Sequence, residues 1–250
     1  MATVVAFGAA RHPRGLPQNV VYIEVWPIHS TLGHLAALVT AALGDKPVVI
    51  AAYQHVYDTA DVAEADLATA FTMATLFSHG ASHLLCGEAD RILADPNYVR
   101  NHRVAPSIAD LLRRWYDFHV EHGELLSDPG FVDMTGALAG AYNDDCDLSY
   151  PASDVPIPGT VWRRVLGRGD RLVVHLINLT GQDDTEWDAP RGRSPSSPVA
   201  CCGCVAAVPE CRGCATPTPT GKRRCGTCRS SWTAISSVSS CRTRTSGKCS

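Results

Sequence analysis

The sequence predicts an α/β protein in which parallel strands alternate with helices, followed by a smaller antiparallel β region. Through the first half of the chain, short β-branched and apolar runs alternate with segments of helical periodicity, and the links between them are short. Further along, two apolar runs flank Gly167-Arg-Gly-Asp170, a signal typical of a β-hairpin. The 250 residues are enough for one barrel-sized domain or two smaller ones.

Charge and cysteine divide the chain into a body and a tail. Residues 201–250 contain eight Lys or Arg and one acid, a balance of +7, whereas the remainder has 14 basic and 24 acidic residues, a balance of −10. Nine of the eleven cysteines also lie beyond residue 200. The body is therefore expected not to depend on disulfides. It has no apolar run near the roughly 20 residues of a membrane span, and the N-terminus does not resemble a signal peptide.

The segment Val20–Pro27 is the first clear strand, because β-branched and aromatic residues dominate it and Pro27 ends it. Side chains alternate along a strand, so Tyr22, Glu24 and Trp26 share one face, and the other face is apolar. A carboxylate between two aromatics is costly unless it is hydrogen-bonded or used in chemistry. On these residues alone, a buried structural Glu and a functional Glu are both open.

Alternation of strands and helices continues after this strand. Ser30 or Thr31 is placed to cap a helix that ends at Gly44. A buried strand over 46–53, a helix over 63–77 and a strand over 81–87 follow, with Glu88 just past the last strand; residues 3–9 form a further possible strand. Short links between alternating elements indicate parallel strands with crossover helices.

A further helix is expected from Ser107, with Asp110 placed for a capping box, and it should end between Gly123 and Pro129. Its expected inner face consists of Ile108, Leu111, Leu112, Trp115, Tyr116 and His119. The acidic, Pro-rich stretch 144–159 indicates a linker. The hairpin strands are expected at 160–166 and 171–179, where His175 alternates with apolar neighbours and is interpreted as structural.

Residues 191–250 form a Cys-, Ser- and Arg-rich tail with too few apolar residues to offset the entropy of folding, which predicts disorder. Three interpretations are open: out-of-frame translation of GC-rich DNA, a zinc ribbon, and a disordered basic tail. The zinc ribbon rests on two C-x-x-C pairs, whose spacing suits a tetrahedral site: Cys211, Cys214, Cys225 and Cys228.

Polar residues at the carboxyl ends of the predicted strands suggest chemistry, since catalytic groups of (β/α) barrels project from these ends. Glu24, Tyr53, His83 and Glu88 occupy such positions. A carboxyl group flanked by aromatics can hold a raised pKa and act as a general acid, and aromatic rings stack on sugars. Glycosidases use two carboxyl groups across the scissile bond, and Glu24 with Glu88 could be that pair.

Five strings resemble a known family, and they occur in its order with similar gaps. They are Tyr22-Ile-Glu-Val-Trp-Pro27, Lys46-Pro-Val-Val-Ile-Ala-Ala-Tyr53, His83-x-x-x-Gly-Glu88, Trp115-Tyr-Asp-Phe118 with Gly123-Glu-Leu-Leu126, and Val174-His-Leu-Ile-Asn178. Over residues 1 to 190 the chain resembles the dextranases and cycloisomaltooligosaccharide glucanotransferases of glycoside hydrolase family sixty-six.

The resemblance implies a retaining hydrolase of α-1,6-glucans, with Glu24 as the acid/base. Trp26, Tyr53, His83 and Glu88 are candidate substrate contacts. The alternatives are barrel packing for Trp26 and Tyr53, an interior histidine for His83, and the cap of a following turn for Glu88. It implies the C-terminal half of a (β/α)₈ TIM barrel over 1–143, a linker over 144–159, a truncated β domain over 160–190 and the tail over 191–250. The nucleophile of the family is an Asp on an earlier strand, and no residue here matches it. Where the family has a second acid between His83 and Glu88, this chain has Leu84, Leu85 and Cys86.

Other functional hypotheses remain open beside an incomplete hydrolase. The chain could be a non-catalytic glucan-binding or partner-binding fragment, or a zinc module carried by its tail. We expect an oligosaccharide ligand, no cofactor, and no nucleic-acid or membrane partner; relatives of full length are expected to be secreted. The open edges of a half-barrel predict self-association.

Overall fold

The computed structural model describes residues 19–26, 28–87, 89–95, 102–139, 146, 148, 150–169 and 171–192, together with the backbone of two strands at 229–232 and 236–242. It divides into two compact units. The first consists of residues 1–129 and 184–193, and the second of 130–183 and 194–250. Within the part described, no helix combines the length and apolar character needed to cross a membrane.

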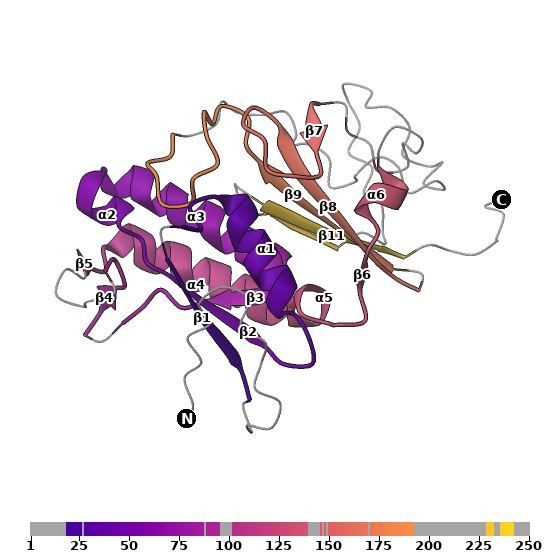
Figure 1. Cartoon of the computed structure of the whole chain (residues 1–250), viewed down its shortest axis with the longest axis horizontal. Helices are drawn as coiled ribbons and strands as arrows, with labels where there is room; N and C mark the ends of the chain where they lie inside the picture. The colour runs from indigo at the N-terminus through magenta and orange to yellow at the C-terminus, as the bar shows by residue number, and fades with distance from the viewer. Residues whose placement is uncertain are drawn as a thin grey trace. The chain divides into compact units, whose positions relative to one another are not determined.

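The first unit is built on a three-stranded parallel sheet, which confirms the predicted strand direction (Figure 1). Its strands are β1 (Val21–Val25), β2 (Val48–Ala52) and β3 (Ala81–His83), in that order. The register aligns Ile23 with Ile50, and both are buried. Alternate residues of β1 are buried, so the apolar face of this strand is covered while the face of Glu24 stays half-buried.

Two long helices connect these strands: α1 (Leu32–Ala42) follows β1, and α3 (Val62–Ser78) lies between β2 and β3. A third long helix, α4 (Pro106–Glu121), comes after β3. Helix α3 contacts α1, α4 and β3, and most of its residues are buried. Thr31 caps α1 as predicted, because its hydroxyl accepts a hydrogen bond from the amide of His34 at 3.2 Å.

The start of α4 differs from the capping-box prediction. The helix begins at Pro106, whose fixed φ suits a first helical position, and Ala105 is the N-cap without a side-chain hydrogen bond. Asp110 instead forms an ion pair with Arg113 on the exposed face of the helix. The inner face is largely as predicted: Ile108, Leu112 and Trp115 are buried, and the rings of Trp115 and Phe77 lie 5.8 Å apart.

Short elements that the sequence did not predict complete the first unit. Helix α2 (Val56–Thr59) follows β2, and a small antiparallel pair, β4 (Arg91–Ile92) and β5 (His102–Arg103), follows β3. Helix α5 (Gly123–Leu126) continues from the end of α4. Each has four residues or fewer, too short for a periodic hydrophobic pattern.

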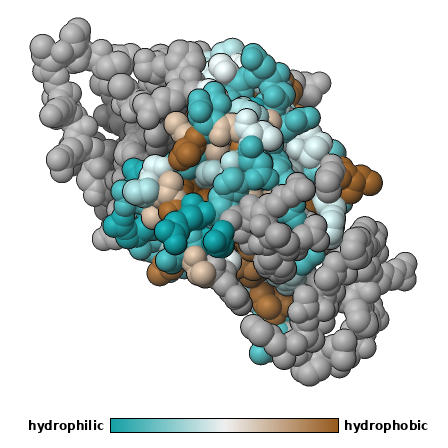
Figure 2. Space-filling view, turned by 90° about the vertical axis from the view of Figure 1, so that its left-hand side faces the viewer, coloured by the Kyte–Doolittle hydropathy of each residue, from teal (hydrophilic) through white to brown (hydrophobic). Residues whose placement is uncertain are grey.

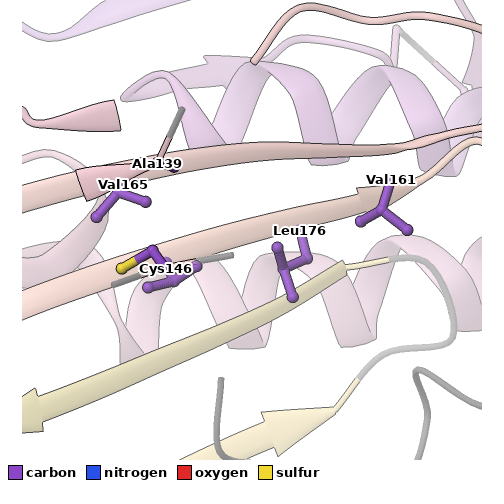
Figure 3. Packing of buried hydrophobic residues seen from close by; sticks show 6 residues of the cluster. Ala139, Cys146, Val161, Val165 and Leu176 are labelled. Carbon is purple, nitrogen blue, oxygen red and sulfur yellow. The ribbon is translucent and has the colours of Figure 1, made fainter. Parts of the chain in front are cut away.

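The second unit contains the predicted hairpin, β8 (Val161–Arg168) and β9 (Arg171–Asn178), paired antiparallel. In its sheet the strands follow the order β10 (Arg229–Trp232), β11 (Ser236–Arg242), β9, β8 and β6 (Val132–Asp133), and β7 (Ala152–Ser153) also pairs with β8. The additional elements are β6 (Val132–Asp133), α6 (Thr135–Leu138) and β7 (Ala152–Ser153). Figure 3 shows part of its core, which consists of Ala139, Cys146, Val161, Val165, Val174 and Leu176.

The predicted linker 144–159 packs within the second unit at the residues that are described. Cys146 is buried, β7 pairs with β8, and the guanidinium of Arg163 donates to the Cys146 carbonyl at 2.9 Å and to Asp154 Oδ1 at 2.9 Å. Arg163 is only 4% exposed, and a buried guanidinium needs such acceptors. One acid of this stretch, Asp154, is therefore a partner of a buried Arg.

Two further segments differ from the expected domain boundaries. Residues 184–193, assigned by sequence to the β domain and the tail, belong to the first unit. Within the tail, where composition predicts disorder, β10 (Arg229–Trp232) and β11 (Ser236–Arg242) are strands, and β11 pairs with β9.

The face of the molecule in Figure 2 is mostly hydrophilic over the residues described, and separate apolar side chains lie among the hydrophilic ones.

Candidate active site

Glu24 lies near the carboxyl end of β1, where its side chain is oriented by a neighbour on the same strand. The Tyr22 hydroxyl donates a hydrogen bond of 3.2 Å to Glu24 Oε1. This contact follows from the strand itself, because residues two apart point to the same face. Glu24 is the only carboxylate in the sequences of β1, β2 and β3.

The register defines which residues share the face of Glu24. Glu24 aligns with Ala51, and Tyr22 aligns with Val49, which in turn aligns with Ser82. This face therefore combines a half-buried, hydrogen-bonded carboxylate with the aromatic ring of Tyr22.

Of the predicted substrate contacts, Trp26 and Tyr53 lie directly after β1 and β2. Both are thus at the carboxyl edge of the sheet, but they differ in accessibility: Tyr53 is buried, whereas Trp26 is half-buried. Glu88 lies outside the described residues, as do the four cysteines of the possible zinc site, Cys211, Cys214, Cys225 and Cys228.

His83 is placed on the other side of the sheet from Glu24. It aligns with Ile50 on the buried face, is 2% exposed, and its Nε2 lies 3.2 Å from the carbonyl oxygen of Ala52. Burial lowers the pKa of His83 to about 4. A neutral, enclosed imidazole is a core residue in this geometry, and the position of His83 does not support a sugar contact.

Three residues that sequence reasoning did not single out meet at the carboxyl edge of the sheet: His55, Trp187 and Asp188. His55 Nδ1 lies 3.0 Å from Asp188 Oδ2, and the amide of Val56 donates to Asp188 Oδ1 at 2.9 Å. Desolvation of its carboxyl group raises the pKa of Asp188 to about 6, although the hydrogen bond from Val56 and the His55 side chain oppose the shift.

The residues before Asp188 pair with the connection that follows β1. The amide of Leu32 donates to the carbonyl of Thr185 at 2.8 Å, and the amide of Trp187 donates to Ser30 at 3.0 Å. The indole Nε1 of Trp187 donates to the His29 carbonyl at 2.5 Å. Thr31 and Glu186 form an antiparallel bridge. No sequence signal indicated these contacts, because about 150 residues separate the partners.

A buried polar network lies beneath this edge. The side-chain nitrogen of Gln54 donates to the Thr72 hydroxyl at 3.2 Å, and the side-chain oxygen of Gln54 accepts from the Thr69 hydroxyl at 3.2 Å. The Thr72 hydroxyl in turn donates to the Trp187 carbonyl at 3.3 Å. The Tyr57 hydroxyl lies 3.0 Å from Asp66 Oδ1 and 3.0 Å from the Thr69 hydroxyl. The connection after β2 is thus fixed to α3 by satisfied polar groups.

A carboxylate at the carboxyl edge of a parallel α/β sheet, beside aromatic side chains, is typical of glycoside hydrolases. The sequence model of glycosyl hydrolase family 66 matches residues 3–200, and the chain belongs to this family. None of the curated proteins with which the sequence was compared matches it.

Among solved structures, the chain is similar to a cycloisomaltooligosaccharide glucanotransferase from Paenibacillus sp., crystallised in complex with cycloisomaltoheptaose. The TM-score is 0.58 at 15% identity, over 89% of this chain and 51% of that one. The likeness shows that the fold is shared, and the chain spans about half the length of that enzyme.

Proposed function

We propose that this chain carries the acid/base half of a family 66 active site that acts on α-1,6-linked glucans by a retaining mechanism. The observation that carries the proposal is Glu24, the one carboxylate of the three parallel strands, hydrogen-bonded to Tyr22 at the carboxyl edge of the sheet. The family match over residues 3–200 supports a glycosidase, and the similar structure in complex with cycloisomaltoheptaose supports an α-glucan as the ligand.

In this proposal Glu24 protonates the glycosidic oxygen as the bond breaks, and later removes a proton from the incoming water or sugar hydroxyl. Tyr22 orients the carboxyl group, and Trp26 offers its exposed surface to a glucose ring. Tyr53 is buried, so it would support the site by packing and would not contact the sugar.

The three parallel strands are proposed to be part of a (β/α)₈ barrel, since β1, β2 and β3 follow one another with crossover helices between them. A retaining glycosidase needs a second carboxylate about 5–5.5 Å from the acid/base. These strands supply none, and we propose that the nucleophile comes from outside the described residues.

An external nucleophile tests the role of Glu24 directly. We would incubate the full chain with an aryl α-isomaltoside and sodium azide, and measure glycosyl azide by mass spectrometry. The C1–oxygen bond to the phenol breaks, azide forms the new bond at C1, and the phenolate oxygen takes its proton from Glu24. Without azide we expect glucan binding but no turnover.

Glu24→Gln should lower the azide-dependent rate by about 100-fold or more, the usual contribution of a general acid. The matched control is Glu64→Gln, which changes an exposed Glu in the first turn of α3 and should leave the rate unchanged. Binding of isomaltooligosaccharides with no azide product would favour a non-catalytic glucan-binding function. Turnover without azide that Glu24→Gln abolishes would show that another carboxylate of this chain, such as Glu88, is the nucleophile.

A further inference from the structure

The segment Thr185–Asp188 contacts both connections that leave the candidate site, although it is distant from them in sequence. Its first three residues pair with the connection between β1 and α1, through Thr185 to Leu32 and Trp187 to Ser30 and His29. Its last residue, Asp188, binds the start of α2 directly after β2. We infer that Thr185–Asp188 is a positioning segment, which joins the two connections and thereby fixes the backbone that carries Glu24 and Trp26.

On the β1–α1 side, Thr185–Asp188 supplies hydrogen-bond partners for backbone groups that have none within the connection. The amide of Leu32 is the first of α1, and the first four amides of a helix have no partner within it. Thr185 supplies the acceptor for this amide. The ring of Trp187 is only 4% exposed, and its indole donates to His29, shortly after Trp26.

On the β2–α2 side, Asp188 acts as a helix cap from another part of the chain. The N-cap of α2 is His55, whose side chain makes no capping hydrogen bond. Asp188 Oδ1 accepts from the Val56 amide instead, and Asp188 Oδ2 binds the His55 ring. The half-buried carboxylate thus fixes the backbone two residues after Tyr53.

The positioning segment is itself held in shape by a buried cation. Arg191 is 3% exposed, and its guanidinium donates to Asp184 Oδ1 at 2.6 Å, to the Asp184 carbonyl at 3.1 Å, and to the carbonyl of Glu186. Because these acceptors lie on both sides of Thr185, they hold the turn in one conformation. A segment held in this way, with hydrogen bonds to two connections, is expected to couple their positions.

This coupling matters for the proposed function. The inference rests on the proposed function only in taking Glu24 and Trp26 as the site. Reacting groups must be held within a fraction of an ångström, and a displacement of about 1 Å can cost about 100-fold in rate. Asp188 and Trp187 would act through the backbone of the two connections and not on the sugar, so they are positioning residues.

Hydrogen exchange of the full chain tests the coupling without any substrate. Asp188→Ala removes the contact with α2, and Trp187→Phe removes the indole contact with His29 while keeping an aromatic ring. In each variant we expect the backbone amides of both peptides, 28–35 and 53–60, to exchange about tenfold faster. This is the effect of losing one charge-assisted or buried hydrogen bond. Exchange in α4 should not change.

Asp188→Asn keeps an acceptor for the Val56 amide, and should restore most of the protection that Asp188→Ala loses. The control Asp61→Asn changes an exposed Asp at the start of α3, whose side chain makes no capping bond, and should exchange as the wild type does. Faster exchange in only the directly contacted peptide, or in neither, would overturn the inference, since no coupling would then exist.

The azide assay distinguishes this inference from the proposed function. If both hold, Asp188→Ala lowers the azide-dependent rate by about tenfold or more, and Asp188→Asn recovers part of it. A wild type that is inactive with azide, but shows the coupled change in exchange, refutes the proposed function and leaves the positioning segment standing. An active wild type with unchanged exchange in the variants refutes the positioning segment alone.

Discussion

Burial and hydrogen-bond partners distinguish the roles of Glu24, Asp188 and His83. Glu24 is half-buried, with a tyrosine hydroxyl on its carboxylate. Asp188 is held by the backbone of Val56 and by His55, with its pKa raised to about 6. His83 is enclosed, and its pKa falls to about 4. Burial removes His83 from contact with a substrate, and both oxygens of Asp188 are engaged by Val56 and His55, which leaves Glu24 as the candidate acid/base.

His83 should make the fold sensitive to mild acid. Its pKa is about 4 in the folded protein and 6.5 when unperturbed, so the unfolded chain binds the proton more tightly. The stability contributed by neutral His83 is complete above pH 6.5 and is lost as the pH falls toward 4. His83→Gln should therefore reduce the acid-side slope of the free energy of unfolding by up to about 1.4 kcal/mol per pH unit.

Urea denaturation at several pH values between 4 and 7 measures this slope. The comparison must be made between variants, because Asp188 acts in the opposite sense: its raised pKa gives stability that is present below pH 3.8 and lost as the pH rises through about 6. His34→Gln, at an exposed position of α1, is the matched control and should keep the wild-type slope. An unchanged slope in His83→Gln would contradict the buried neutral imidazole.

Among the elements, the end of α3 depends on a glycine that the sequence did not single out. Gly80 has φ +89°, and a Cβ at this position would lie 3.2 Å from the carbonyl oxygen of Leu126. Gly80→Ala should lower the free energy of unfolding by about 1–2 kcal/mol, because an L-residue strains this conformation and the backbone of α5 cannot easily move away. Chemical denaturation followed by circular dichroism measures the change.

Gly123→Ala is the control for this substitution, since a Cβ at Gly123 meets nothing within 4 Å and the residue begins α5. Alanine is the better helix former, so this variant should be neutral or more stable by up to about 1 kcal/mol. Equal unfolding midpoints for the two variants would mean that the left-handed conformation of Gly80 costs alanine nothing.

At the scale of the whole molecule, the order β1-β2-β3 leaves β1 and β3 at the edges of the sheet among the residues described. Outward N–H and C=O groups of an edge strand pair readily with another chain. We therefore expect the apparent mass of the full chain to rise with concentration in light scattering. A clean monomer across the accessible concentration range would contradict this expectation.

Val20→Lys should weaken the association, because it places a charge immediately before β1 at a side chain that is 37% exposed. The control is Val62→Lys, which replaces a side chain of similar exposure, 48%, at the first residue of helix α3. Equal effects of the two substitutions would indicate general solubility rather than strand pairing.

Local patterns predicted the long elements well. Apolar runs and caps located β1, β2, α1, α3 and the β8–β9 hairpin within a few residues, and short links predicted the parallel strands. The prediction failed where elements are short, as at α2, or where a residue had two available partners. Asp110, for example, pairs with Arg113 and caps nothing.

The candidate site also has a part that the sequence indicated and a part that only the structure shows. The sequence alone indicated Glu24 as the candidate acid/base and placed Tyr22 on the same face, because residues two apart on a strand share a face. The hydrogen bond between them comes from the structure. The order of the motifs indicated the family that the match over residues 3–200 confirms. Only the tertiary structure decided that His83 is buried away from Glu24, and that Trp187 and Asp188 reach the same edge. Those contacts join residues more than 130 positions apart, and no local pattern encodes such a pairing.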